Sequence, residues 1–284
     1  MGKPEKNYTQ ASDIITKSMT NIKSAFRVLV LGIILTLIYS RTFSFTLIPV
    51  FEGFVLAIFL AWFISKVDLK PASAFLLVWN SLFIIGYCNN LLEAYFFTKV
   101  YPSESLIMAI LISLFSALLE STCAILLLRP EGSRDITAAL KSHISSRTGS
   151  SWVKRIIAAS AVYFLIYFIF GLMVSPFVMP YYSQPSSGLV IPSLTLMIPL
   201  ELLRGFIYAV VLLVVFAGIK TGERLNFAVA SALLYIPGAF LPLISSMMSL
   251  SFISAVAPYH MVEILADSVV YGYAASRLIG AKSE

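Results

Sequence analysis

Long apolar runs alternate with short polar segments along the whole chain of 284 residues. Windows of about 19 residues, close to the length a helix needs to cross a bilayer, separate these runs into discrete spans. The predicted spans cover residues 25–40, 43–65, 73–97, 105–128, 155–179, 195–219, 226–247 and 259–280. A strand of a membrane barrel needs only about 10 residues, so the pattern predicts an all-α, polytopic membrane bundle with about eight transmembrane helices.

The composition agrees with a chain whose main partner is the lipid bilayer. Hydrophobic residues make up 59% of the sequence and charged residues 12%, against roughly 45–50% and 25% in an average soluble protein. A soluble core could not bury this excess of apolar side chains. Lipid can accept it, provided that helices satisfy every backbone hydrogen bond internally.

The basic residues between the spans are distributed unequally over the two sides. The N-terminal segment, the loops 66–72, 129–155 and 220–225 and the C-terminal end carry nearly all of them, whereas the opposite loops carry only Arg41 and Lys99. Basic loops stay on the cytoplasmic side, so both termini are predicted to be cytoplasmic, in the cytoplasmic membrane of a prokaryotic cell. The net charge of +6 is explained by these loop anchors and does not indicate nucleic-acid binding.

This orientation divides the chain into four regions. They are a cytoplasmic N-terminal segment (1–24), a first four-helix half (25–128), a cytoplasmic loop (129–154) and a second four-helix half (155–284). Apolar residues at helical spacing predict interfacial amphipathic helices in the N-terminal segment (Ile14, Ile15, Met19, Ile22) and in the loop (Ile136, Leu140, Ile144). Ordinary polar loops explain the same pattern equally well, and His143 is expected to be solvated there.

The two halves share short motifs that suggest an internal repeat. Arg27 and Tyr39 in the first span are separated like Arg155 and Tyr167 in the fifth, and the next span of each half contains an Ile-Pro pair followed by an acidic residue and a Gly-Phe pair. Each half has an even number of crossings, so a duplication of this kind would be parallel, with an axis along the membrane normal.

Several spans carry polar groups that are costly in hydrocarbon, about 2.5–3.5 kcal/mol for each charged side chain at the helix centre. With both termini inside, most of these groups fall at a similar depth in the outer half of the membrane. We therefore predict one polar pocket that is open to the outer face. The candidate residues are Glu52 on the second span, Asn89, Asn90 and Glu93 on the third, Glu201 and Arg204 on the sixth, and His260, Glu263 and Asp267 on the eighth.

The acidic residues outnumber the basic ones within the spans. Glu120 joins the five acids of the predicted pocket, whereas the spans contain, away from their cytoplasmic ends, only one arginine, Arg204, and one histidine, His260. A low-dielectric site cannot keep all these carboxylates ionised, so protons or a bound cation should share it. The alternative is that Glu201 with Arg204 and His260 with Glu263 are structural clamps between helices. In the seventh span, Pro237 and Pro242 predict a kinked or broken helix.

An enzyme is a third alternative, although the sequence leans against it. Cys88, Arg204 and His260 resemble the Cys, Arg and His set of exosortase-like membrane transpeptidases in residue type, but the sequence around Cys88 lacks the small residues and glycine of that family. No metalloprotease, serine-hydrolase, Walker or dinucleotide-binding motif is present. We expect no metal and no cofactor.

The leading hypothesis from the sequence is a proton- or cation-linked transporter or permease for a small solute. A non-transporting membrane scaffold or assembly factor is the second hypothesis, and an intramembrane enzyme is the third. The sequence does not predict the oligomeric state.

Overall fold

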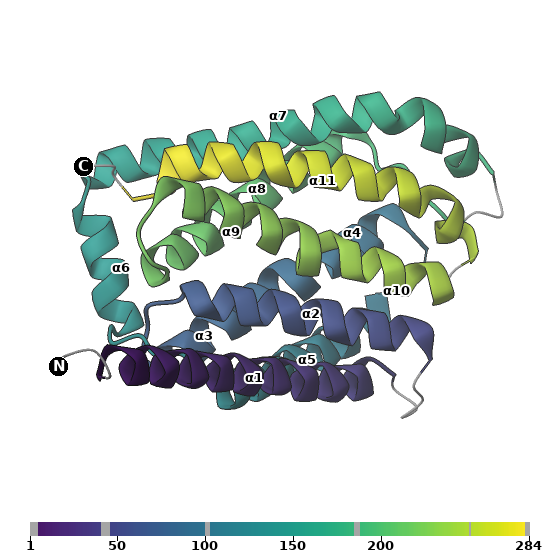
Figure 1. Cartoon of the computed structure of the whole chain (residues 1–284). Helices are drawn as coiled ribbons and strands as arrows, with labels where there is room; N and C mark the ends of the chain where they lie inside the picture. The colour runs from purple at the N-terminus through teal and green to yellow at the C-terminus, as the bar shows by residue number, and fades with distance from the viewer. Residues whose placement is uncertain (1–4, 41–45, 100–102, 185–187, 250, 282–284) are drawn as a thin grey trace.

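The protein folds as a bundle of long helices (Figure 1). A computed structural model describes residues 5–40, 46–99, 103–184, 188–249 and 251–281, with the side chains of 5–21, 103–104, 248–249 and 251–253 left out. Over these ranges, the only β-structure is in isolated bridges. The helices are α1 (Glu5–Ser40), α2 (Leu47–Lys66), α3 (Pro71–Ser81), α4 (Asn89–Phe97), α5 (Ser103–Leu128), α6 (Ile136–Ser145), α7 (Gly149–Tyr182), α8 (Leu194–Gly218), α9 (Glu223–Tyr235), α10 (Leu241–Ser249) and α11 (Ser251–Ile279).

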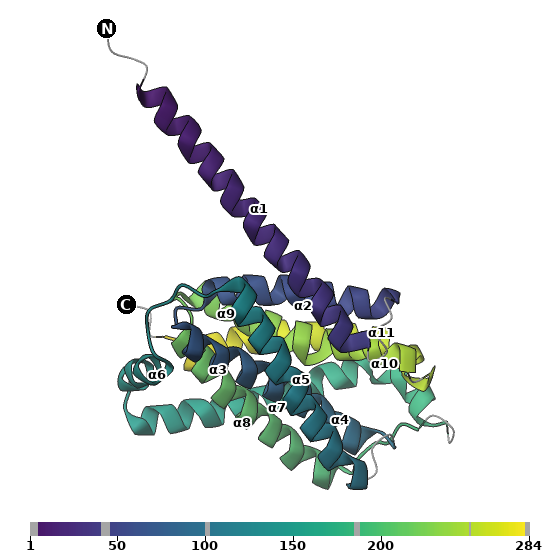
Figure 2. The same cartoon turned by 90° about the horizontal axis from the view of Figure 1, so that it is seen from below.

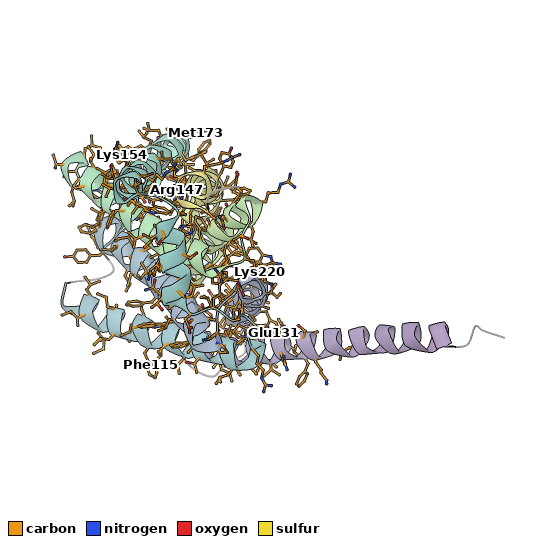
Figure 3. All side chains as sticks on the ribbon, turned by 90° about the vertical axis from the view of Figure 1, so that its left-hand side faces the viewer. Phe115, Glu131, Arg147, Lys154, Met173 and Lys220 are labelled. Atoms are coloured by element: carbon orange, nitrogen blue, oxygen red, sulfur yellow. The ribbon has the colours of Figure 1, made fainter. Side chains whose placement is uncertain are left out.

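Seven stretches of helix are long and apolar enough to cross a membrane among the residues described. They are Ile22–Ser40, Leu47–Lys66, Pro71–Phe97, Ser105–Leu128, Gly149–Tyr182, Leu194–Gly218 and Glu223–Met247. Large apolar side chains such as Phe115 and Met173 are about 60% exposed and point outward from the bundle (Figure 3). Such a surface suits lipid and not water.

The helix α11 corresponds to the predicted eighth span but is not among these seven stretches. It is 29 residues long and packs along α7 and α9 for most of the length of the bundle (Figure 1). Its hydropathy is lowered by the polar side chains His260, Glu263 and Asp267. An eighth crossing therefore remains a prediction.

The third and seventh predicted spans each contain a π-helical segment where one backbone turn is widened. The segment η1 (Leu82–Cys88) joins α3 to α4, and η2 (Ile236–Phe240) joins α9 to α10. The proline in η2 removes a backbone donor at the start of the widened turn, and the chain continues through it as helix without a break. The two widened segments pack against each other in the middle of the bundle.

The ends of α2 and α8 are joined by a short antiparallel bridge. Asp68 N–H donates to the Gly218 carbonyl at 2.9 Å and Lys220 N–H donates to the Lys66 carbonyl at 2.8 Å, so that Val67 and Ile219 face each other. This bridge lies at the end of the bundle where α3 and α9 begin (Figure 1).

The predicted interfacial segment of the 129–154 loop forms the helix α6, which lies across the end of the bundle where α11 ends (Figures 1 and 3). The expectation that His143 is solvated is wrong. It is 8% exposed, and its Nε2 lies 2.9 Å from the Ile279 carbonyl. Arg147 and Arg155 donate to the neighbouring carbonyls of Gly280 and Leu278. These side chains cap the C-terminus of α11, where carbonyls lack helical donors and the helix dipole favours positive charge.

The N-terminal helix α1 runs without a break from Glu5 to Ser40, so it passes the predicted boundary at residue 24 (Figure 2). Its first part extends beyond the rest of the bundle. The side chains of Ile14, Ile15 and Met19 lie outside the described residues, and so does residue 43, the predicted start of the second span.

Candidate functional site

The charged centre of the site is Arg204, a buried side chain on α8. Its Nη1 donates to both carboxylate oxygens of Glu201 at 2.9 Å, which confirms that the i, i+3 spacing forms a local ion pair. Across the bundle, its Nε donates to Asn89 Oδ1 at 2.8 Å and its Nη2 donates to Glu93 Oε2 at 3.2 Å, both on α4. Arg204 thus joins α8 to α4, and most of its N–H donors are used within the protein.

Tyrosines surround the guanidinium group. The Cζ atom of Arg204 lies 5.9 Å from the ring centre of Tyr163 and 5.7 Å from that of Tyr167, both on α7. Tyr163 also packs edge-to-face against Tyr208 on α8 and Tyr271 on α11. The rings of Tyr163 and Tyr167 present their negative faces to the positive charge, which stabilises it.

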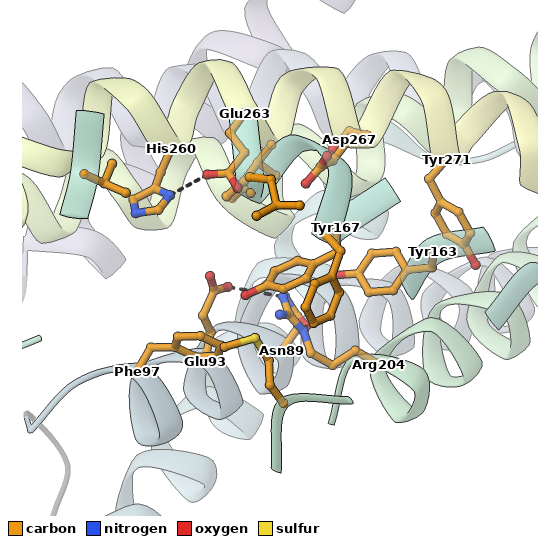
Figure 4. A pocket seen from close by; sticks show the side chains of 18 of the residues that line it. Asn89, Glu93, Phe97, Tyr163, Tyr167, Arg204, His260, Glu263, Asp267 and Tyr271 are labelled. Carbon is orange, nitrogen blue, oxygen red and sulfur yellow. Dashed lines mark hydrogen bonds and ion pairs between the residues drawn. The ribbon is translucent and has the colours of Figure 1, made fainter. Parts of the chain in front are cut away.

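The polar stripe of α11 faces this network from the other side of a cavity (Figure 4). His260 Nδ1 lies 2.7 Å from Glu263 Oε2, so the second predicted i, i+3 pair also forms. One helical turn further, Asp267 is 8% exposed. Its Oδ1 atom is buried and has no hydrogen-bond partner among the described residues.

The cavity between α4, α7, α8, η2 and α11 has a volume of about 300 Å³, at the low end of the range for small-molecule sites. Three carboxyl groups (Glu93, Glu263, Asp267) and two basic groups (Arg204, His260) line it. Most of the remaining wall is aromatic or aliphatic. Polar groups from the third, sixth and eighth predicted spans therefore do come together around one space.

Three predicted site residues do not line the cavity. Glu201 is fully buried and is connected to the site through its ion pair with Arg204. Asn90 does not line the cavity, because its Nδ2 atom donates at 2.8 Å to the carbonyls of Gly86 in η1 and Gly238 in η2. A π-helical turn leaves carbonyls without their usual helical donors, so Asn90 stabilises the contact between the two widened segments.

Glu52 is also outside the cavity, buried on α2 in the first half of the chain. It lies near Tyr39 of α1. A second polar cluster is found there, in which the Tyr87 hydroxyl donates to Glu120 Oε1 and Tyr39 lies beside both side chains. Polar groups inside the membrane therefore gather in two places and not in one.

Cys88 is half-buried in η1 and is not one of the residues that line the cavity. Arg204 and His260 are there without it, so the three side chains of the enzyme hypothesis do not share the site. Within the described residues, no group of three His, Cys, Asp or Glu side chains is arranged to hold a metal ion.

Tyr163 and Tyr167 are the main residues of the cavity wall that the sequence did not reveal. Tyrosine is common in membrane helices at the lipid interface, so neither residue is unusual by itself. Tyr163 and Tyr167 are four residues apart in the middle of a long apolar span, and Gly171 follows one turn later. This spacing could have predicted that the three residues share one face of the helix. Glu263 lies against α7 at this position, since a Cβ atom on Gly171 would be 3.4 Å from Glu263 Oε1, an ordinary van der Waals contact.

Comparison with known proteins gave no match: no family model, curated sequence or solved structure is detectably similar to this chain.

Proposed function

We propose that the protein is a transporter or permease of the cytoplasmic membrane, which takes a small solute into the cavity and couples its passage to a proton or another cation. The observation that carries this proposal is the cavity itself, in which carboxyl groups outnumber basic groups. Ionisable side chains facing a cavity inside a membrane usually mark an ion or substrate pathway.

The charges around the cavity support coupling to a cation. Arg204 offers one positive charge to two carboxylates, Glu201 and Glu93, and His260 can balance only Glu263. Asp267 then has no compensating charge. A proton or a bound cation would neutralise this surplus, and its exchange with the solution is the step that a transporter would couple to movement of the solute.

The proposed topology has eight crossings and both termini in the cytoplasm. Along the long axis of the bundle, the start of α1 and the end of α11 lie toward the same end as α6, as an even number of crossings requires, although the first part of α1 extends sideways away from the bundle (Figures 1 and 2). Arg147, Lys154 and Lys220 surround the same end (Figure 3), in agreement with the excess of basic residues in cytoplasmic loops. On this topology the cavity lies in the outer half of the membrane.

We further propose that the two halves are a parallel repeat, as many transporters are. Several helix boundaries support this, because they recur with a shift of 152 residues, the difference between Lys66 and Gly218, where α2 and α8 end. Other boundaries depart from this shift: the starts of α2 and α8 (Leu47, Leu194) differ by 147 residues, and the ends of α3 and α9 (Ser81, Tyr235) by 154. With the same shift, α3 and α9 begin at Pro71 and Glu223. The π-helical segments end at Cys88 and Phe240, and α4 and α10 begin at Asn89 and Leu241.

Contacts between the halves obey the same shift and support a pseudo-twofold axis. The facing residues Val67 and Ile219 correspond to each other. In the middle of the bundle, a Cβ atom on Gly86 would contact Pro237, and one on Gly238 would contact Ile85. The shift of 152 residues relates Gly86 to Gly238 and Ile85 to Pro237. The two contacts are therefore equivalent, as a twofold axis between the halves requires.

Flux measurements on reconstituted protein test the proposed function. Wild-type protein in liposomes should carry protons, monovalent cations or one of a panel of small solutes when a pH or ion gradient is applied, above the rate of empty liposomes. Asp267→Asn and Glu201→Gln should reduce this flux at least about tenfold, because each removes a charge from the cavity network. Asp135→Asn is the matched control, since Asp135 forms an exposed pair with Lys70 far from the cavity. Absence of flux for every gradient and solute would contradict the proposal.

The alternative is a membrane scaffold or assembly factor, and the Arg204 network is the observation that favours it. An arginine that joins α4 to α8 through Asn89 and Glu93 stabilises the fold whether or not anything enters the cavity. If this alternative is correct, Glu201→Gln will lower the melting temperature in detergent, and neither flux nor ligand-dependent stabilisation will be found.

A further inference from the structure

We propose that the cavity binds a small organic cation, with an amine or ammonium group at Asp267 and an apolar or aromatic body against the tyrosine wall. This inference rests on the proposed role of the cavity as a solute site and adds the chemical class of the solute.

The first argument is that the only strong positive charge among the described residues that line the cavity already has partners. Arg204 donates to Glu201, Asn89 and Glu93, and its Cζ atom lies 5.9 Å and 5.7 Å from the ring centres of Tyr163 and Tyr167. An anionic solute would have to displace these partners and leave at least one carboxylate buried and unpaired, which is costly. The arginine therefore stabilises the site and is not available to bind an anionic solute.

The second argument is that Asp267 lacks a partner. It is more than nine-tenths buried, lines the cavity and points into it (Figure 4). Its Oδ1 atom has no hydrogen-bond donor among the described residues. A buried polar atom without a partner is uncommon in folded proteins, and an N–H donor from a bound solute would satisfy it.

The third argument concerns the kind of cation. A divalent metal needs several protein ligands, and no three candidate side chains in the described structure are arranged to supply them. An ammonium group is satisfied by one carboxylate together with aromatic faces. Tyr163, Tyr167 and Tyr271 all line the cavity close to Asp267 (Figure 4), and the small volume excludes large solutes.

Equilibrium binding to the purified full-length protein in nanodiscs tests this inference. The probe is radiolabelled 2-phenylethylammonium, and its competitors are 2-phenylethanol, which is neutral, and 3-phenylpropionate, which is an anion of similar size. We expect saturable binding of the cation and little competition by the other two compounds. Asp267→Asn should weaken binding at least about tenfold, since the carboxylate charge that pairs with the ammonium group is lost, whereas Asp135→Asn should leave it unchanged.

The melting temperature of Asp267→Asn distinguishes a folding defect from a loss of binding. The variant is expected to keep the fold, because the amide at this position is uncharged. Stronger competition by 3-phenylpropionate would overturn the inference and assign the site to anions. Equal binding of the neutral alcohol, or unchanged binding by Asp267→Asn, would overturn it as well, and so would the absence of saturable binding to the folded protein. Because this assay involves no flux, binding without transport would refute the proposed function alone, and flux of other solutes without amine binding would refute only the inference.

Discussion

Arg204 gives the clearest prediction about stability. In Arg204→Met, Glu201 loses the donor to both of its carboxylate oxygens, and it has no other partner among the described residues. Glu201 is 0% exposed, so water cannot replace the arginine. Removing one member of a buried ion pair typically costs about 3–5 kcal/mol, because the remaining charge is left uncompensated. We expect a loss of this size in the free energy of unfolding.

Steric trapping in bicelles measures this free energy directly in a membrane-like environment. The double variant Arg204→Met with Glu201→Gln should recover part of the loss, because a neutral amide replaces the stranded carboxylate. The coupling energy between the two sites should be about 0.5–3 kcal/mol.

The control is Arg277→Met, which breaks an ion pair with Glu223 whose arginine side chain is 57% exposed. Exposed pairs contribute about 0–1 kcal/mol, so this change should be small. If Arg204→Met is no more destabilising than Arg277→Met, or if the double variant recovers nothing, the description of a buried, mutually dependent network is wrong.

Three further predictions test the architecture. Cysteines introduced at Val67 and Ile219, in a background without the two native cysteines, should form a disulfide on mild oxidation. Facing residues in such an antiparallel bridge have Cα atoms about 4.5 Å apart, which suits a disulfide. Absence of the cross-link would refute the contact between the halves. Burial lowers the pKa of His143, so its stabilising contribution is present above the unfolded pKa of about 6.5 and is lost as the pH falls through the lower folded value. The melting temperature of wild type should therefore fall more between pH 7.5 and 5.5 than that of His143→Gln, and equal losses would contradict the burial. Gly205→Ala should destabilise, since its Cβ would lie 2.7 Å from a backbone carbonyl of α7, whereas Gly149→Ala, with nothing within 4 Å, should not; equal melting temperatures would refute the close helix approach.

Hydropathy was sufficient to predict the helical membrane class and most spans, because the bilayer imposes length and composition on every crossing. It did not predict the π-helical turn η1, which contains no proline to mark it. The widened turn at η1 is explained by the hydrogen bonds that the Asn90 side chain donates to the carbonyls of Gly86 and Gly238. The bond to Gly238 joins distant parts of the chain, which local sequence does not predict.

The same limit applies to the site. Spacing along one helix predicted the pairs Glu201–Arg204 and His260–Glu263, since residues three apart share a face. The contact of Arg204 with Glu93 depends on how α4 packs against α8, which spacing does not encode. Glu52 was assigned to the pocket from its estimated depth, but depth does not tell which side of the bundle a residue faces.

Accessibility of the cavity from the two sides of the membrane tests the central proposal most directly. Ser175 lines the cavity on α7, and Ser65 is exposed on the last turn of α2 at the proposed cytoplasmic end. In cells expressing Ser175→Cys without the two native cysteines, a membrane-impermeant maleimide added outside should label the protein, whereas Ser65→Cys should react only after permeabilisation. Labelling of Ser175→Cys only after permeabilisation, or no labelling at all, would contradict a polar cavity that opens to the outer face.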